Sequence, residues 1–252
     1  MKVLITGASS GIGRDLAKEF AKRNYSIVLV ARNEEKLKEL QNEIESKYNI
    51  KVEYYIADLS NKEACINLYK KYEDIDVLIN NAGLGDFGLF SETELEKDIL
   101  LINTNITALH ILTKLYLKKM KEKNNGIILN VASIAGFMPG PLMATYYATK
   151  NYVVRLSEAI REELKKEKSN VKISILCPGP VDTNFNSVAN VKFGVRGLNS
   201  EYVAKYTVRK LLKSKFYIVP GFSIRITKLL SKIIPTGIMA KCAYYMQKRK
   251  EG

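Results

Sequence analysis

The sequence predicts an α/β protein in which a parallel sheet carries helices on both of its faces. Six short, mostly apolar runs alternate along the chain with segments whose apolar residues recur at helical spacing, which is typical of strand–helix–strand units. Runs that are apolar on both faces indicate strands buried in a parallel sheet. No internal repeat or long linker divides the 252 residues, so we expect one doubly wound domain over 1–252.

Each expected strand is followed by an amphipathic segment. After the first strand and a glycine-rich turn, Leu16 and Phe20 lie one helical turn apart, and Leu37, Leu40 and Ile44 mark a second helix. The expected strands cover 2–6, 26–31, 52–57, 75–79, 127–132 and 171–176, with a short seventh at 216–219. The expected later helices cover 62–72, 100–120 and 145–166.

The positive charge of the chain is concentrated near its end. The formal net charge is +14, from 40 lysines and arginines against 26 acidic residues. Residues 201–252 hold 12 basic and two acidic residues, a net +10 that leaves +4 for the first 200. A basic protein can bind nucleic acid, but no nucleic-acid motif or aromatic platform accompanies this charge. We therefore expect no nucleic-acid partner.

Cysteine and histidine usage argues against a metal site. The three cysteines, Cys65, Cys177 and Cys242, are far apart and form no C-x-x-C pair, and His110 is the single histidine. Such cysteines indicate free thiols in a reducing compartment. No apolar run is long enough to span a membrane or to form a signal-peptide core. We expect a cytoplasmic protein without a metal.

The turn after the first strand is suited to a phosphate. Gly7, Gly11 and Gly13 allow a tight turn and a close backbone approach, and a helix N-terminus attracts anions. Ser9, Ser10 and Ile12 complete the turn. Residues 7–11 also match the G-x-S-x-G nucleophile elbow of hydrolases. That function needs a histidine after the acid in the chain and an oxyanion loop that follows an earlier strand. The only histidine, His110, lies on an amphipathic helix, and no further strand precedes the one that leads into this turn.

The end of the second strand predicts which dinucleotide binds. About 20 residues past the glycines, an acid would hydrogen-bond the ribose 2′-hydroxyl and select NAD. Arg32 stands there instead, and a guanidinium suits a 2′-phosphate. The sequence thus predicts NADP (NADPH), with Arg14 as a possible second contact. The alternative is that Arg32 is a solvated cation at the start of a helix.

A tyrosine and a lysine supply the chemistry of carbonyl reduction. Protonating a ketone oxygen near neutral pH requires an acid, and a tyrosine of pKa about 10 is too weak unaided. Tyr146 and Lys150 lie four apart on an expected helix, so the ammonium is predicted to lower the tyrosine pKa. Tyr147 has Asn151 four residues later and lacks this lysine. Taken alone, Tyr146 and Lys150 fit an exposed helix pair better than a catalytic pair, and the accompanying motifs reverse this preference.

Further motifs follow in a fixed order: Asp58-Leu59, Asn80-Asn81-Ala82-Gly83, Asn105, Ser133, Tyr146-x-x-x-Lys150 and Pro178-Gly179. With the glycine turn, they make residues 1–185 resemble the short-chain dehydrogenases/reductases. The resemblance implies a Rossmann-type sheet of about seven parallel strands, a nicotinamide cofactor, and hydride transfer to or from a carbonyl carbon. It also implies a homodimer or homotetramer.

The resemblance assigns roles to individual residues. Ser133 would hold the substrate oxygen, Asn105 would order a water that relays protons, and Lys150 would also bind the ribose. The remaining implied cofactor contacts are Asp58 and Leu59 near the adenine, Asn81, Ala82 and Gly83, and Pro178, Gly179, Val181 and Thr183. Three of these residues have structural alternatives: Asp58 would start the next helix, Asn105 would kink or cap its helix, and Ser133 would bond to backbone.

Loops at the carboxyl ends of the strands predict an apolar substrate. In an open α/β sheet these loops set specificity, and they cover 84–90, 134–144 and 184–198, within a substrate region that extends to about 215. They hold few charges and these apolar residues: Phe87, Phe90, Phe137, Met138, Leu142, Met143, Phe185, Val188, Val191 and Phe193. We expect a small apolar carbonyl or alcohol substrate, such as a steroid, a lipid-like ketone or an acyl ketone.

The segment from about 220 to 250 is a basic amphipathic extension. Ile226, Leu229, Leu230, Ile233 and Ile234 recur at helical spacing, with basic residues off that stripe. Such a helix can lie on an anionic membrane. A lid over the substrate cleft, or packing on the body or a second subunit, fits the same pattern. The sequence therefore predicts an NADP(H)-dependent oxidoreductase; the alternative is a non-catalytic redox sensor or membrane-surface protein.

Overall fold

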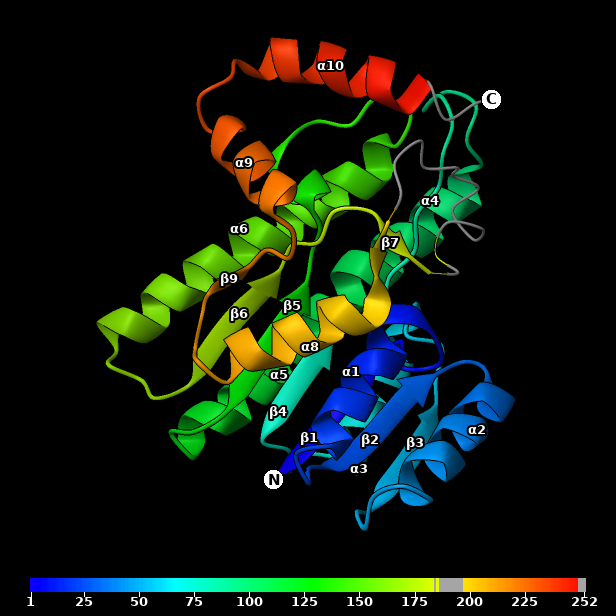
Figure 1. Cartoon of the computed structure of the whole chain (residues 1–252), viewed down its shortest axis with the longest axis vertical. Helices are drawn as coiled ribbons and strands as arrows, with labels where there is room; N and C mark the ends of the chain where they lie inside the picture. The colour runs from blue at the N-terminus through cyan, green and yellow to red at the C-terminus, as the bar shows by residue number, and fades with distance from the viewer. Residues whose placement is uncertain (184, 186–196, 249–252) are drawn as a thin grey trace.

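The core of the protein is a seven-stranded sheet in which every strand pairing is parallel. The computed structural model describes residues 1–183, 185 and 197–248. The strand order is β3-β2-β1-β4-β5-β6-β9 (Figure 1). The strands are β1 (Lys2–Thr6), β2 (Ser26–Ala31), β3 (Val52–Ile56), β4 (Val77–Asn80), β5 (Ile127–Val131), β6 (Lys172–Leu176) and β9 (Tyr217–Ile218). All seven predicted strands, the short last one included, are confirmed.

Helices cover both faces of the sheet, as predicted. One hydrophobic cluster joins the sheet to α1 (Gly11–Ala21), α2 (Glu34–Glu45) and α8 (Ser200–Leu211). The other cluster joins the opposite face to α3 (Lys62–Lys71), α5 (Leu109–Glu122) and α6 (Ala144–Lys166). Successive residues of a strand belong alternately to the two clusters. In β1, Leu4 belongs to the cluster with α3, α5 and α6, whereas Val3 and Ile5 belong to the cluster with α1, α2 and α8. This explains why the strands are apolar on both faces.

The helix predicted over 100–120 differs from the observed one. It begins earlier, as α4 (Leu95–Ile102), and continues into α5 through a π-helical segment, Asn103–Ala108. A π segment inserts one extra residue into the helical repeat, so the apolar spacing read across it does not mark a single regular helix. This segment carries Asn105 toward the carboxyl ends of the strands.

The strand order reverses between β1 and β4, and the main cavity opens at their carboxyl ends. That position is where open α/β sheets bind ligands. A 3-10 turn (Ile134–Phe137) follows β5, and a separate two-stranded pairing of β7 (Val181–Asp182) with β8 (Leu198–Asn199) follows β6. These connections form the rim of the cavity.

The C-terminal segment folds into two helices, α9 (Phe222–Leu230) and α10 (Thr236–Lys248), joined by a short turn. In Figure 1 this hairpin, in orange and red, stands over the carboxyl ends of the strands and apart from the two helical layers. We call α9 and α10 with their connection the C-terminal hairpin. Among the described helices, none has the length and apolar character needed to cross a bilayer.

Candidate active site

The glycine turn accepts only glycine at its key positions. Gly7 and Gly11 have φ angles of +64° and +53°, which other residues adopt only with strain. A Cβ at Gly13 would lie 2.3 Å from the carbonyl oxygen of Gly7, and a Cβ at Gly7 would lie 2.9 Å from the Cα of Ala82. The turn is therefore packed backbone against backbone between the ends of β1 and β4.

The N-terminus of α1 keeps its amide groups clear of side chains. Ser10 is the N-cap residue but makes no side-chain capping bond, and the first turn of α1 holds no acid. By contrast, Asn33, Asn61 and Asn199 cap α2, α3 and α8 by accepting backbone N–H groups. Because the α1 amides lack such a side-chain acceptor and face the cavity, this end of the cavity fits a phosphate.

Thr6 and Asn81 hold the two strand ends together. The Asn81 side chain donates to the carbonyl oxygens of Thr6 and Gly7 at 3.0 and 3.1 Å. The backbone N–H groups of Asn81 and Ala82 donate to the Thr6 hydroxyl at 2.9 and 3.0 Å. Sequence reasoning missed Thr6, although a hydroxyl residue ending β1 directly before the glycines was a usable signal. Asn80 instead points into the core, where it donates to Thr113 and Asn130.

Arg32 and Asp58 stand together at one end of the cavity, which they line with Ala31, Asn33 and Leu59. Burial raises the pKa of Asp58, but hydrogen bonds from Ser60 and the Arg32 charge outweigh it and hold that pKa below its usual value. Asp58 accepts from both the backbone N–H and the hydroxyl of Ser60. The alternative that Asp58 starts the next helix is wrong, because Asn61 is the N-cap of α3; Asp58 instead forms a turn with Ser60 and lines the cavity.

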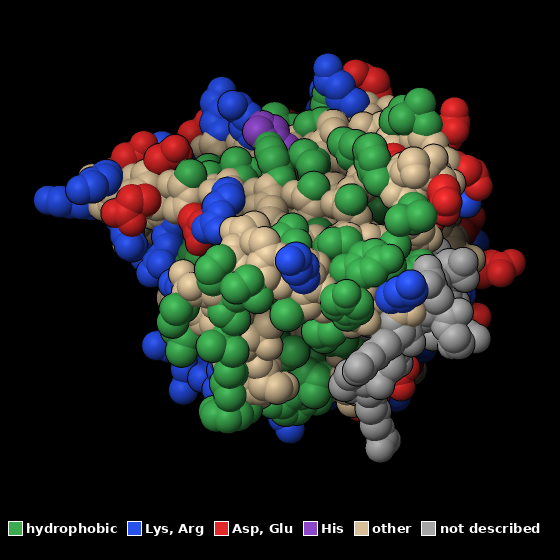
Figure 2. All heavy atoms as spheres, turned by 90° about the horizontal axis from the view of Figure 1, so that it is seen from above, with side chains coloured by type: hydrophobic (Ala, Val, Ile, Leu, Met, Phe, Trp, Pro, Cys, Tyr) green, Lys and Arg blue, Asp and Glu red, His purple; other side chains and the backbone are tan. Residues whose placement is uncertain are grey.

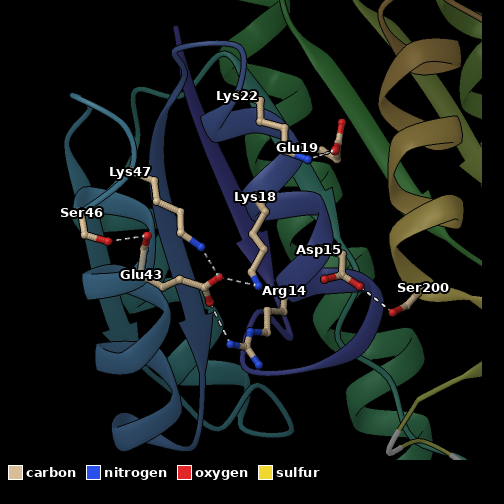
Figure 3. Close-up of polar contacts among 9 residues, drawn as sticks. All are labelled: Arg14, Asp15, Lys18, Glu19, Lys22, Glu43, Ser46, Lys47 and Ser200. Carbon is tan, nitrogen blue, oxygen red and sulfur yellow. Dashed lines mark hydrogen bonds and ion pairs between the residues drawn. The ribbon is translucent and has the colours of Figure 1, made fainter.

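Arg14 is engaged elsewhere. Its Nη2 donates to Glu43 Oε2 at 2.9 Å, and Glu43 also pairs with Lys18 and Lys47 (Figure 3). Hydrogen bonds from these cations, Lys18 first, outweigh burial and lower the pKa of Glu43 to about 2. Arg14 lines a smaller neighbouring pocket and not the main cavity. The geometry therefore separates Arg14 from Arg32, which the sequence had grouped.

The predicted catalytic side chains Ser133, Tyr146 and Lys150 line one cavity of about 640 Å³. The same cavity reaches the glycine turn and Arg32. Ser133 lies two residues after the end of β5, and Tyr146 lies in the first turn of α6; the Ser133 side chain lowers the pKa of Tyr146 by hydrogen bonding to its charged form. The Ser133 hydroxyl also accepts the N–H of Ala135 and donates to the Pro178 carbonyl, so its predicted backbone role is present too.

Burial dominates the protonation of Tyr146 and Lys150. It raises the pKa of Tyr146 to about 12, against the opposing hydrogen bond with Ser133. It lowers the pKa of Lys150 to about 8. The Lys150 ammonium lies 5.7 Å from the Tyr146 ring centroid and donates to the Val131 carbonyl at 3.1 Å. The predicted lowering of the Tyr146 pKa is therefore wrong for this structure, because desolvation of the phenolate raises this pKa and outweighs the opposing effect of Ser133.

Asn105 is buried behind the cavity, in the π segment. Its Oδ1 accepts the N–H of Leu84 at 2.8 Å, and its Nδ2 donates to the Leu84 carbonyl and to Thr149 Oγ1. A Cβ on Gly83 would lie 3.2 Å from Asn105 Oδ1 and 3.3 Å from Lys150 Nζ. Asn105 thus ties the loop after β4 to α6 close to Lys150, and the residue of this segment that lines the cavity is Thr104.

The segment after β6 closes the cavity from the other side. Pro178, Gly179, Val181 and Thr183 all line it. A Cβ on Gly11 would lie 2.9 Å from Thr183 Cγ2, so Thr183 lies against the glycine turn. The structure therefore brings together every predicted cofactor contact except Gly13, which lies beneath the turn. No group of three or more metal-ligating side chains lies together among the described residues.

Apolar side chains form the remaining wall. Of the predicted substrate residues, Met138, Met143 and Phe185 line the cavity. Phe90 is exposed, and Phe137 contacts Tyr217 instead; Val188, Val191 and Phe193 lie outside the described residues. The alternative in which the C-terminal segment covers the substrate cleft agrees with the structure, although sequence reasoning named none of its residues as site residues. The cavity-lining residues of the C-terminal hairpin are Ile224, Thr227, Leu230, Ser231, Ile234, Met239, Cys242, Ala243, Met246 and Gln247.

One hydrogen bond joins the hairpin to the catalytic helix. Gln247 Nε2 donates to the hydroxyl of Tyr147 at 2.7 Å, across 100 residues of sequence. Burial raises the pKa of Tyr147, so its hydroxyl stays protonated at neutral pH. Tyr147 follows the predicted catalytic tyrosine directly, and this contact gives it a structural role at the cavity.

Comparison with known proteins identifies a matching family and several similar chains. A family model described as short chain dehydrogenase matches residues 1–192. The very-long-chain 3-oxoacyl-CoA reductase-B of Danio rerio is 30% identical over 270 residues, which cover 99% of this chain and 84% of that relative. Among the curated relatives of that activity, the chain spans between 53% and 84% of the relative's length.

Two solved structures share the fold. A short-chain dehydrogenase from Sphingobium yanoikuyae in complex with NADPH has a TM-score of 0.85 at 30% identity and covers 94% of each chain. A short-chain dehydrogenase/reductase from Burkholderia phymatum in complex with NAD has a TM-score of 0.82 at 25% identity, covering 91% of this chain and 92% of the other. The cofactors bound to the two structures differ, so similarity alone does not select NADP or NAD.

Proposed function

Because this chain belongs to the short-chain dehydrogenase family, we propose that it is an NADP(H)-dependent oxidoreductase that reduces an apolar ketone. The observation that carries the proposal is a single cavity of about 640 Å³ lined by Ser133, Tyr146 and Lys150 at one place and by the glycine turn at another. A redox sensor has no need of a buried tyrosine and lysine beside the dinucleotide site.

The cavity fits a nicotinamide dinucleotide. The positive-φ glycines leave no Cβ between the backbone and a diphosphate, and the uncapped N-terminus of α1 offers N–H donors. Arg32, where an acid would favour NAD, is positioned for a 2′-phosphate. We propose NADP on that basis, and the NADPH complex of the Sphingobium relative supports it. The further proposed contacts are Asp58, Leu59, Asn81, Ala82, Gly83, Pro178, Gly179, Val181 and Thr183.

Tyr146 is the proposed proton donor. When bound, the nicotinamide supplies the hydride to the carbonyl carbon. The pKa of Tyr146, near 12, keeps its hydroxyl protonated at neutral pH, which is the form that a reduction requires. Ser133, whose side chain opposes the rise in the Tyr146 pKa and lines the same cavity, is the proposed group that holds the substrate oxygen beside that proton. Lys150, with a pKa of about 8, is mostly a cation at pH 7 and stabilises the phenolate left on Tyr146.

The walls of the cavity favour an apolar substrate. The ring centroids of Tyr146 and Phe185 lie 5.6 Å apart. Both rings belong to one apolar cluster with Met143 and Phe87. The inner face of the C-terminal hairpin adds Leu230, Ile234 and other apolar side chains. We propose an acyl or lipid-like ketone rather than a small charged keto acid, and the 3-oxoacyl-CoA reductase activity named for the Danio relative supports this class. Residues 184–215 and 220–250 are the proposed substrate-specific part of one domain.

The exposed face of α4 supports a dimer or tetramer. Leu95, Ile99 and Ile102 lie three to four residues apart on this helix, and each is at least 40% exposed. Contiguous exposed apolar side chains mark interfaces. We propose that a second copy of the chain covers them, and sedimentation of Ile99→Glu compared with the unmodified protein tests this.

The test is NADPH oxidation at 340 nm with 3-oxoacyl thioesters and bulky ketones, in Tyr146→Phe and in a matched control. The control is Tyr152→Phe, on the same helix, whose hydroxyl is hydrogen-bonded to His110 at 2.7 Å and does not line the cavity. We expect turnover to fall by roughly 10²- to 10⁴-fold in Tyr146→Phe while NADPH still binds, and to survive in Tyr152→Phe. NADPH binding without turnover on any carbonyl compound would contradict the reductase and favour a sensor.

A further inference from the structure

The C-terminal hairpin is apolar on two opposite sides. Its inner side lines the cavity through Ile224, Leu230 and Ile234 on α9 and the turn after it. Its outer side carries Phe222, Ile226, Leu229 and Ile233, which follow one another at spacings of three and four residues and do not line the cavity. Phe222, Leu229 and Ile233 are 75%, 61% and 74% exposed. Exposed apolar side chains that recur over several turns of a helix normally mark a surface that another molecule or a membrane covers.

The second helix of the hairpin repeats this arrangement. Met239 and Ala243 of α10 line the cavity, whereas Ile238 and Tyr245 are exposed and do not line it. Figure 2, which views the molecule from the side of α10, shows a face dominated by apolar side chains, with single Lys and Arg side chains among them and acidic ones at its margins. The outer apolar surface thus extends over both helices. We call it the outer hairpin face.

The charge around the outer hairpin face has one sign. Between residues 220 and 248 the sequence has five basic residues and no acidic one: Arg225, Lys228, Lys232, Lys241 and Lys248. Lys232 and Lys241 are exposed, and neither forms an ion pair with a carboxylate in the part of the chain that the structure describes. Exposed apolar side chains bordered by lysines match the interface of a bilayer with anionic headgroups.

Contacts between the C-terminal hairpin and the rest of the protein keep the outer hairpin face exposed to solvent. Arg225 donates to the Val219 carbonyl and to the Tyr206 hydroxyl. The Lys228 ammonium lies 3.0 Å from the Tyr217 ring centroid. Gln247 binds Tyr147 at the far end of the hairpin. Since these contacts fix the inner side against the body, the outer apolar side chains cannot turn inward without breaking them.

We propose that the outer hairpin face docks on an anionic lipid bilayer, with Phe222, Leu229 and Ile233 inserted among the lipids and Lys232 and Lys241 at the headgroups. A second copy of the chain fits less well, because face-to-face pairing would bring Lys232 and Lys241 of both copies together, and residues 220–248 offer no acid to pair with them. Resting on the proposed function, the same docking would set the mouth of the substrate cavity at the lipid surface and give an apolar ketone a direct route into it.

Sedimentation of the full chain with phosphatidylcholine vesicles, with and without phosphatidylglycerol, tests the docking. We expect binding to the anionic vesicles only, and a loss of about 30-fold in partitioning for Lys232→Gln/Lys241→Gln, at about fivefold per lysine. Leu229→Glu/Ile233→Glu is expected to abolish binding. The control is Leu212→Glu, at an exposed leucine that follows α8 and lies outside the C-terminal hairpin, and this variant is expected to bind like the unmodified chain.

Two further readouts separate the possible failures. NADPH affinity and turnover of a water-soluble ketone are expected to stay unchanged in Leu229→Glu/Ile233→Glu, which reports both folding and the proposed function independently of lipid. Equal binding to both vesicle types, or none to either, would overturn the proposal. So would sedimentation that shows a dimer of the unmodified chain dissociated by Leu229→Glu/Ile233→Glu, because the face would then pair with a second copy.

Discussion

The two walls of the cavity are built by different means. The wall at the glycine turn is backbone against backbone, with contacts so close that a Cβ at Gly13 would lie 2.3 Å from a carbonyl oxygen. The wall at the C-terminal hairpin consists of apolar side chains on two helices, held by a few contacts such as the bond from Gln247 to Tyr147. The first wall therefore tolerates almost no substitution, whereas the second can change its shape one side chain at a time.

The largest expected effect is at the first wall. Gly13→Ala places a methyl group where no space exists, so we expect NADPH affinity to fall more than 100-fold, or the chain to lose its fold. The matched control is Gly237→Ala in α10, where a Cβ would meet nothing within 4 Å. Calorimetric titration with NADPH measures both variants. An unchanged NADPH affinity in Gly13→Ala would contradict the claim that the wall at the glycine turn tolerates almost no substitution.

Arg32 tests whether the first wall also selects the cofactor. Removing a charge-assisted hydrogen bond weakens binding by roughly 10- to 100-fold. We expect Arg32→Gln to raise the KM for NADPH by that factor and to leave the KM for NADH nearly unchanged. In Arg14→Gln, whose guanidinium is already bound to Glu43, the ratio of the two KM values should not move. Steady-state kinetics with both cofactors measure this ratio. A change of the ratio in Arg14→Gln but not in Arg32→Gln would show that Arg14, and not Arg32, contacts the 2′-phosphate.

Adjacent leucines sharpen the account of the second wall. Leu230 lines the cavity, whereas Leu229 belongs to the outer hairpin face. We expect Leu230→Ala to raise the KM for a soluble apolar ketone about tenfold, because a hydrophobic wall loses several methyl and methylene contacts. Leu229→Ala should leave that KM unchanged, and the KM for NADPH should be unchanged in both. Equal effects of the two substitutions would contradict the assigned inner and outer sides.

The smallest expected effect is on the thermal stability of the protein, and it concerns the buried charge of Lys150. The pKa of Lys150 is about 8 in the folded protein, below its ordinary 10.5, so the unfolded chain binds more protons between these values. The contribution of Lys150 to stability therefore rises as pH increases from about 8 to 10.5, and at pH 7 its buried charge destabilises the fold. We expect Lys150→Met to raise Tm by a few degrees at pH 7 while abolishing turnover. A lower Tm would show that the cation stabilises the fold.

The same difference between the walls explains what the sequence could predict. Backbone geometry requires glycine at positions 7, 11 and 13, and this requirement is visible as a motif in the sequence. The pairing of Tyr146 with Lys150 is visible in the same way, because the two residues are spaced four apart on one helix. The inner side of the hairpin leaves only helical periodicity, which indicates that a helix has an apolar face and not what that face covers. Leu230 and Gln247 were therefore missed as cavity residues.

Electrostatic properties were predicted less well than positions. The sequence indicates that Tyr146 and Lys150 are neighbours, but the degree of burial depends on α6, the loop after β6 and the hairpin together. Burial reverses the expected direction of the Tyr146 pKa shift. Likewise, Arg14 lies near the glycine turn in sequence, but Glu43, 29 residues later, binds it. Long-range contacts of this kind are absent from local sequence patterns.

The central claim is that the cavity holds NADPH at one wall and an apolar ketone at the other. Its most direct test is the transfer of deuterium from NADPH to the ketone. NADPH deuterated at the transferable position of the nicotinamide C4 is incubated with an apolar ketone, and the alcohol product is analysed by mass spectrometry. We predict one deuterium on the carbinol carbon, formed by the unmodified protein and by Tyr152→Phe, and at a rate lowered by roughly 10²-fold or more in Tyr146→Phe. An alcohol without deuterium, or label transfer at an undiminished rate in Tyr146→Phe, would contradict it.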